Sequence, residues 1–172
     1  MTAPIRVLIC GTGNSAHALV GIFSLKTNVE VRVLTQNADK ANQWETLIAR
    51  GQHTVLVCGE NEDLAVSMAN PLIVTNDPET VVCGCDIIIL AVPASLHWDY
   101  LTLVEPYIEN GCIIMGLPGQ CGFESEVGQA LGKKLNSCII MNFESLPWIC
   151  RMVEFGKTVK ITGTKAKLIG AV

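Results

Sequence analysis

The sequence has few aromatic residues, few charges and no long apolar run, and each shortage excludes a class of protein. Three Trp, two Tyr and four Phe among 172 residues are too few for a base-stacking platform. The net charge of −4 argues against a nucleic-acid partner, which requires clustered Lys and Arg. The longest nearly continuous apolar stretch, Ile87 to Ala94, is far too short to span a bilayer. We therefore expect no nucleic-acid partner and no membrane partner.

The eight cysteines contain no CxxC pair, which argues against a redox motif or a zinc site. Cys83 and Cys85 are separated by one residue, a spacing with poor geometry for a disulfide. The first residues, MTAPIR, lack the basic region and apolar core of a signal peptide. These features predict reduced, mostly buried thiols in a cytoplasmic protein with no metal site.

Apolar residues make up 49% of the chain and charged residues 16%, a composition that excludes disorder and indicates one globular domain over residues 1–172. Apolar segments with strand character alternate with segments of helical periodicity. Strands are expected at 5–10, 29–34, 53–58, 64–68, 72–75, 86–91, 112–115, 138–141 and 157–162, and helices at 14–25, 38–50, 78–83, 95–105 and 123–131. This order predicts an α/β fold of the Rossmann type, a doubly wound and mostly parallel sheet. A small β-hairpin insertion at 53–68, turning at 59–63, interrupts the alternation, and 163–167 is expected to be a turn.

The clearest motif is the segment Gly11-Thr12-Gly13-Asn14-Ser15-Ala16, which matches GxGxxG/A between a predicted strand and a predicted helix. Gly11 permits a tight turn, Gly13 lets the backbone approach a pyrophosphate, and Ala16 allows close packing of the helix on the strand. The free N–H groups at the helix start favour an anion. The motif predicts dinucleotide binding, although a glycine-rich turn that only connects two elements remains an alternative. His17, one residue further on, is expected to pack or cap locally.

The preferred nucleotide is not decided by the residues alone. NAD sites usually carry Asp or Glu at the end of the second strand, where it binds the ribose hydroxyls. Here Thr35, Gln36 and Asn37 occupy that place, with neither an acid nor an Arg for a 2′-phosphate. Asp39 and Lys40 follow and could support either preference, so NAD and NADP both remain open at this point.

Three further strand ends carry candidate side chains at the same edge of the predicted sheet. Val92, Pro93 and Ala94 form a stiff apolar loop suited to a nicotinamide ring, and His97, a candidate substrate-binding residue, follows in the first helical turn. Gln120 lies in the loop after the next strand and offers an amide to a carboxylate. Glu144 follows the last parallel strand and could accept hydrogen bonds from an amine. Each residue also has an ordinary structural explanation: local packing for His97, a turn residue for Gln120 and a solvated or Arg-paired Glu144.

The motifs together resemble the N-terminal cofactor domain of the invertebrate opine dehydrogenases, over essentially the whole chain. The resemblance rests on GTGNSAHAL, VEVRVLT, DIIILAVPASLH, IIMGLPGQCGFE and MNFESLPWICRMVEFGKTV, which occur in this order. It implies an enzyme that condenses a 2-oxo acid, typically pyruvate, with an amino acid and reduces the imine with NADH. In anoxic muscle, this reaction reoxidises NADH at the end of glycolysis.

The resemblance also implies residue roles and favours NAD(H) over NADP. Gly11, Gly13, Asn14 and Ala16 would hold the pyrophosphate; Gln120 would contact the oxo-acid carboxylate, and Glu144 the amino group. The family's second, helical domain carries a catalytic His–Asp pair and an Arg clamp, so we expect no catalytic residue in this chain, little turnover by it alone, and a monomer.

Two other functions remain as alternatives. One is a different NAD(P)-dependent reductase of the glycerol-3-phosphate or 2-oxo acid type, and the other is a nucleotide-binding module without catalysis. The apolar ending at Val172 is expected for a cut chain rather than for a natural terminus.

Overall fold

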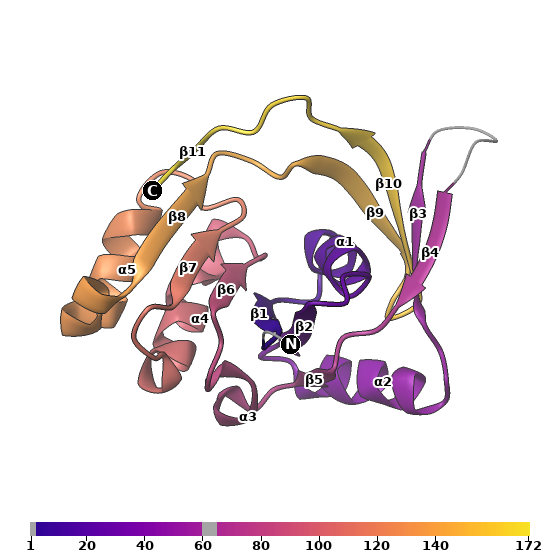
Figure 1. The fold of residues 1–172 in the computed structure, drawn as a ribbon, viewed down its shortest axis with the longest axis horizontal. Coiled ribbons are helices and arrows are strands. Elements are labelled where there is room, and N and C mark those ends of the chain that lie inside the picture. Colours follow the sequence, from indigo (N-terminus) through magenta and orange to yellow (C-terminus); the bar gives the residue numbers. More distant parts are fainter. Residues whose placement is uncertain (1–2, 60–64) are drawn as a thin grey trace.

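The chain folds around a seven-stranded sheet, six strands of which are parallel. The computed structural model describes residues 3–59 and 65–172. The strand order is β11-β8-β7-β6-β1-β2-β5, and only β11 is antiparallel to its neighbour (Figure 1). The strands are β1 (Ile5–Cys10), β2 (Val29–Leu34), β5 (Ile73–Thr75), β6 (Ile87–Leu90), β7 (Ile113–Gly116), β8 (Ile139–Phe143) and β11 (Gly170–Ala171). The predicted doubly wound α/β fold is confirmed.

Helices cover both faces of this sheet, which explains why its central strands are almost entirely apolar. Alternate residues of β1 illustrate the division: Val7 and Ile9 pack toward one pair of helices, whereas Leu8 and Cys10 pack toward the other group. The first pair is α1 (Asn14–Phe23) and α2 (Ala38–Ala49); the second group is α3 (Pro78–Val82), α4 (His97–Val104) and α5 (Phe123–Leu131). Short 3-10 turns occupy Ala94–Leu96, Glu105–Tyr107 and Gly132–Ser137.

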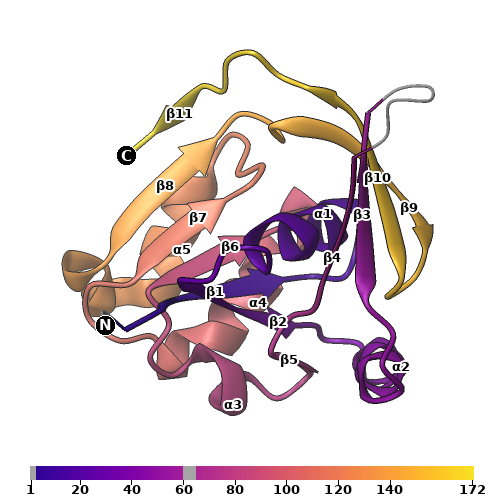
Figure 2. The same cartoon turned by 45° about the vertical axis from the view of Figure 1, so that its right-hand side comes forward.

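A second sheet of four strands packs on the far side of α1, so that this helix lies between two sheets (Figures 1 and 2). Its order is β4-β3-β10-β9, formed by β4 (Ala65–Ala69), β3 (Thr54–Cys58), β10 (Thr158–Thr164) and β9 (Trp148–Glu154). Ala18 of α1 packs there against Leu56, Cys150 and Val159. Because α1 contacts apolar surface on several sides, a continuous run from Ala16 to Gly21 is buried.

The expected hairpin is therefore one half of a separate sheet, whose other half comes from the end of the chain. The strand β9 was not predicted, and β10 includes Gly163 and Thr164, which were expected to belong to a turn. The predicted hairpin turn at 59–63 and the predicted strand start at Leu64 fall mainly on residues 60–64, which lie outside the described residues.

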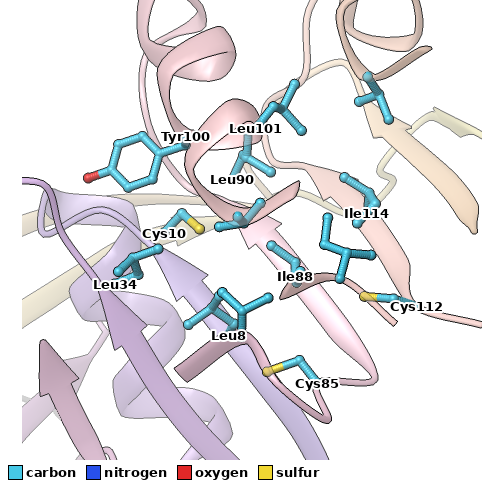
Figure 3. Close-up of a cluster of buried hydrophobic side chains, with 14 of the residues drawn as sticks. Leu8, Cys10, Leu34, Cys85, Ile88, Leu90, Tyr100, Leu101, Cys112 and Ile114 are labelled. Carbon is cyan, nitrogen blue, oxygen red and sulfur yellow. The ribbon is translucent and has the colours of Figure 1, made fainter. Parts of the chain in front are cut away.

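Three buried cysteines lie in the apolar core between the sheet and helices α3–α5 (Figure 3). Cys10, Cys85 and Cys112 are buried there, and all eight cysteines are free thiols. Burial raises the pKa of Cys85 to about 11 and that of Cys112 to about 12, so both remain protonated near neutral pH. These three thiols are thus small core residues with little nucleophilic character.

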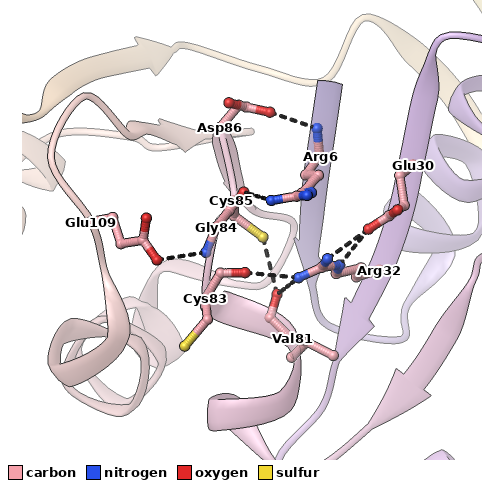
Figure 4. A network of polar contacts seen from close by, with 9 residues as sticks. All are labelled: Arg6, Glu30, Arg32, Val81, Cys83, Gly84, Cys85, Asp86 and Glu109. Carbon is pink, nitrogen blue, oxygen red and sulfur yellow. Dashed lines mark hydrogen bonds and ion pairs between the residues drawn. The ribbon is translucent and has the colours of Figure 1, made fainter. Parts of the chain in front are cut away.

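A polar network closes the edge of the main sheet where β1 and β2 begin (Figure 4). Arg32 pairs with Glu30 through a 2.6 Å Nη2–Oε1 contact and donates to the carbonyl oxygens of Val81 and Cys83. The backbone N–H of Arg6 donates to Asp86, 2.7 Å away. These contacts give hydrogen-bond partners to carbonyl groups at the end of α3 and link the start of β1 to the residue before β6. They lie at the end of the sheet opposite the predicted site.

Candidate dinucleotide and substrate site

The two glycines of the first turn have different physical requirements. Gly11 has a φ of +110°, and a Cβ there would lie 2.6 Å from Cγ1 of Val92, so the fold itself requires glycine. Gly13 precedes α1 in an extended conformation, and a Cβ there would meet no atom within 4 Å. Open space in front of Gly13 therefore leaves the start of α1 accessible to an approaching group.

Two side chains of α1 fasten this turn to the second sheet. Oδ1 of Asn14 accepts a hydrogen bond from the backbone N–H of Met152, at 2.8 Å. The ring of His17 contacts both the first turn and the second sheet. Nδ1 lies 3.0 Å from the carbonyl oxygen of Gly13, and Nε2 accepts a hydrogen bond from the N–H of Gly156 at 2.9 Å. The hydrogen bond to Met152 uses only the side-chain oxygen of Asn14, so its Nδ2 amide and its backbone N–H are the donors that can bind an anion.

The ring of His17 is fully buried and neutral. Burial lowers its pKa to about 4, and the ring stacks on Trp44 with centroids 4.0 Å apart. Because Nε2 accepts a hydrogen bond from the N–H of Gly156, the ring's own proton sits on Nδ1, which donates a hydrogen bond to the carbonyl oxygen of Gly13. His17 thus packs locally, as the sequence predicted, and also links the first turn to the β9–β10 connection, which the sequence did not reveal.

The loop after β2 is held without any carboxylate. The backbone N–H of Gln36 donates to the hydroxyl of Tyr100 at 3.3 Å, and that of Asn37 donates to Oγ1 of Thr35 at 3.3 Å. Oδ1 of Asn37 caps α2 by accepting from the N–H of Lys40. Thr35 is buried and its hydroxyl helps to shape this loop, while its contact with the cofactor stays a prediction.

β1 and β6 are neighbours in the sheet, at the position where the strand order changes direction. The ends of these two strands are the usual place for a ligand in this fold. Oγ of Ser15 donates to the carbonyl oxygen of Ala91 at 3.2 Å, which ties the two strand ends together. A crevice of about 360 Å³ opens here; among its lining residues are Gly13, Asn14, Ser15, Ala91, Val92, Pro93, Pro118, Leu146 and Trp148. It unites the turn after β1 with the predicted apolar loop after β6.

His97 lies beneath these loops rather than on their surface. Its side chain is 1% exposed, its ring meets Phe123 edge-on at 5.2 Å, and Nδ1 lies 3.7 Å from Oε2 of Glu126. Burial lowers the pKa of His97, and the Glu126 carboxylate opposes that shift. The expected substrate contact of His97 remains a prediction, since the ring is covered in this structure.

A second pocket, of about 670 Å³, follows the ends of β7 and β8. Its lining residues are Gln120, Cys121, Glu124, Asn142, Glu144, Ile169, Gly170 and Ala171. Gln120 and Glu144, predicted from separate motifs, are therefore brought to one pocket. Glu124 and Asn142 were not predicted as site residues, although both stand in the motifs that supplied Gln120 and Glu144. The two charged lining residues are carboxylates, which favour a cationic group nearby.

No family model matches the chain, but individual proteins do. The opine dehydrogenase of Haliotis discus hannai is 43% identical over 176 residues, covering 99% of this chain and 43% of that enzyme. The tauropine dehydrogenase of Arabella iricolor is 42% identical over 168 residues, covering 98% of this chain and 42% of the enzyme. The chain is thus similar in sequence to opine dehydrogenases over about two fifths of their length.

Solved structures of octopine dehydrogenase agree with this relationship. Those with NADH and L-arginine and with NADH and pyruvate each match with a TM-score of 0.92 and 38% identity. They are covered over 41% and 42% of their lengths, whereas 96% of this chain is matched. The chain thus spans about two fifths of the length of these opine dehydrogenase relatives.

The helices of the described part are all too short or too polar to cross a membrane. Within the same residues, no group of three or more His, Cys, Asp or Glu side chains is placed to hold a metal ion.

Proposed function

We propose that residues 1–172 form the NAD(H)-binding domain of an opine dehydrogenase, which reductively condenses a 2-oxo acid such as pyruvate with an amino acid. The observation that carries this proposal is the crevice lined by Gly13–Ser15 of the first turn and by Val92 and Pro93 of the loop after β6. Related opine dehydrogenases, and octopine dehydrogenase with NADH bound, support it. The groups that complete catalysis are proposed to lie outside this chain.

The residues of the crevice fit a dinucleotide. The space in front of Gly13, which a Cβ would enter, leaves room for a pyrophosphate against the start of α1. The first turn of α1 carries no acidic side chain that would repel it. Val92, Pro93 and Trp148 offer apolar surface of the kind that a nicotinamide ring requires.

Bound NADH would supply a hydride to the imine formed from the two substrates. The chain's own residues would bind and orient: N–H groups at Gly13 to Ala16 hold the phosphates, and the loop at Val92 shields one side of the ring from water. The amide of Gln120 donates to the oxo-acid carboxylate, while the carboxylate of Glu144 accepts from the amine. Fixing two substrates beside the cofactor replaces encounters in solution with a positioned reaction.

Titration of this chain with NADH and NADPH, followed by nicotinamide fluorescence, tests the cofactor proposal. We expect NADH to bind with a preference over NADPH. Failure of both to bind would refute the proposed cofactor domain, and a clear preference for NADPH would refute the choice of cofactor. In the complete protein, NADH oxidation should require both pyruvate and an amino acid; oxidation with the oxo acid alone would favour a simple 2-oxo acid reductase.

We also propose a monomer working in the cytoplasm. Eight free thiols suit a reducing compartment. Light scattering at micromolar concentration should give the mass of one chain, and a dimer mass would contradict the proposal.

A further inference from the structure

Gln120 adopts a backbone conformation that its residue type disfavours. Its φ is +62°, and it is the one non-glycine residue with positive φ among residues 3–59 and 65–172. Left-handed conformations persist at non-glycine residues when surrounding contacts enforce them, and they concentrate at functional sites. The conformation of this turn therefore requires a holding contact.

Asn142, at the end of β8, supplies that contact. Its Nδ2 donates to the carbonyl oxygen of Gln120 at 3.1 Å and to Oε1 of Glu124 at 2.7 Å. One amide group thus joins the turn after β7 to the first turn of α5. An aspartate at this position has the same shape but no donor for either acceptor.

The residue before Gln120 makes the approach possible. A Cβ at Gly119 would lie 2.1 Å from Oδ1 of Asn142, so the side chain reaches Gln120 only because Gly119 has none. The N–H of Gly119 donates to the carbonyl oxygen of Phe143 at 3.0 Å, which fixes the turn against β8. Oδ1 of Asn142 is buried and has no hydrogen-bond partner among the described residues. Nδ2 therefore makes the side-chain hydrogen bonds that hold this turn.

We propose that Asn142 is a positioning residue for the 2-oxo acid, holding Gln120 in its left-handed turn and drawing Glu124 away from the substrate carboxylate. The inference rests on the proposed function. The pocket contains two carboxylates, Glu124 and Glu144, and a substrate carboxylate beside Gln120 is repelled by both. By binding Oε1 of Glu124, Asn142 fixes that charge on the α5 side of the pocket while the Gln120 amide remains available.

Substrate kinetics in the complete protein test the role of Asn142. Asn142→Asp should raise the KM for pyruvate at least tenfold and leave the Kd for NADH within twofold. Asn42→Asp, at an exposed position on α2, is the matched control and should change neither constant. The proposal is overturned if Asn142→Asp leaves the KM for pyruvate within twofold, or if it weakens pyruvate and NADH equally, as general disruption of the fold would.

Thermal unfolding of the 172-residue chain tests the contact independently of any reaction. In a Gln120→Gly background the left-handed turn carries no penalty. In the wild type, relaxation of the strained turn after Asn142→Ala recovers part of the lost hydrogen-bond energy, so Asn142→Ala should lower the midpoint more in the Gln120→Gly background than in the wild-type background. Equal losses in the two backgrounds would overturn the proposed hold on Gln120. If the wild-type protein forms no opine at all, the proposed function and the substrate role of Asn142 both fail, whereas the coupling between Asn142 and Gln120 would still be measured.

Discussion

Acidification should weaken the fold through His17, because this buried ring cannot accept a second proton without losing a hydrogen bond. Its Nε2 accepts from the N–H of Gly156, and protonation would set two N–H groups against each other. Burial lowers the pKa of His17 from 6.5 to about 4 in the folded chain. The unfolded chain therefore binds the proton more readily between these two values.

The sign and size of the effect follow from this difference in pKa. The contribution of His17 to the free energy of unfolding is fully present above about pH 6.5. It falls as the pH decreases toward 4, and it changes no further below that pH. At 1.36 kcal/mol for each pKa unit, the full loss is about 3 kcal/mol, a large part of a typical domain's stability.

Urea unfolding between pH 7.5 and pH 4, compared between the wild type and His17→Phe, measures this contribution. Phenylalanine keeps the stacking on Trp44 but leaves the N–H of Gly156 without its acceptor, which costs about 1–3 kcal/mol at neutral pH. Carboxylates titrate in both proteins, so their effect cancels in the difference.

The stability advantage of the wild type over His17→Phe should shrink, and then reverse or vanish, as the pH falls to 4. His53→Gln, at an exposed histidine, controls for the loss of a histidine in general. A difference between wild type and His17→Phe that stays constant from pH 7.5 to pH 4 would refute the assigned pKa and the tautomer.

Other variants separate folding from binding at the predicted site. Gly13→Val should remove NADH binding in the titration, because the side chain fills the space proposed for the pyrophosphate. Circular dichroism should stay normal, because a Cβ at Gly13 meets no atom of the chain within 4 Å. Gly11→Ala should instead lower the stability of the fold, since its Cβ would clash with Val92. Near-normal NADH affinity in Gly13→Val would place the phosphates elsewhere. In the complete protein, Gln120→Ala should lower kcat/KM for pyruvate and Glu144→Gln that for the amino acid, each by about ten- to a hundredfold for a lost charge-assisted bond. If both variants lose NADH affinity equally and keep their substrate constants, Gln120 and Glu144 belong to the cofactor site instead.

Local sequence patterns were sufficient for the central sheet. The environments of β6 and of the glycine turn after β1 can be predicted from a few residues each. A strand covered on both faces must be apolar, and a tight turn needs glycine, so both constrain the local composition. The convergence of Gln120 and Glu144 followed from one rule, that parallel strands end at the same edge. No comparable local rule exists for Asn142, since its partners are two turns of chain that only the folded structure brings together.

The second sheet illustrates what local patterns could not predict. Its central pairing joins β3 to β10, with Val55 opposite Thr158, and nothing in either segment identifies a partner about a hundred residues away. The strand β9 mixes charged and apolar residues in WICRMVE, without the strict alternation that marks a half-buried strand. The sequence therefore predicted an isolated hairpin and a separate final strand where the structure has one sheet.

This second sheet makes the cofactor turn depend on residues far along the chain. Asn14 and His17 bind backbone groups of Met152 and Gly156, so the position of α1 relative to the crevice is set partly from β9 and its connection to β10. The same strand continues to Trp148, which lines the crevice beside Gly13. A short GxGxxA motif thus identifies where a dinucleotide is expected to bind, but the conformation of the turn is determined jointly by the motif and by a sheet that closes over α1 from the opposite end of the chain.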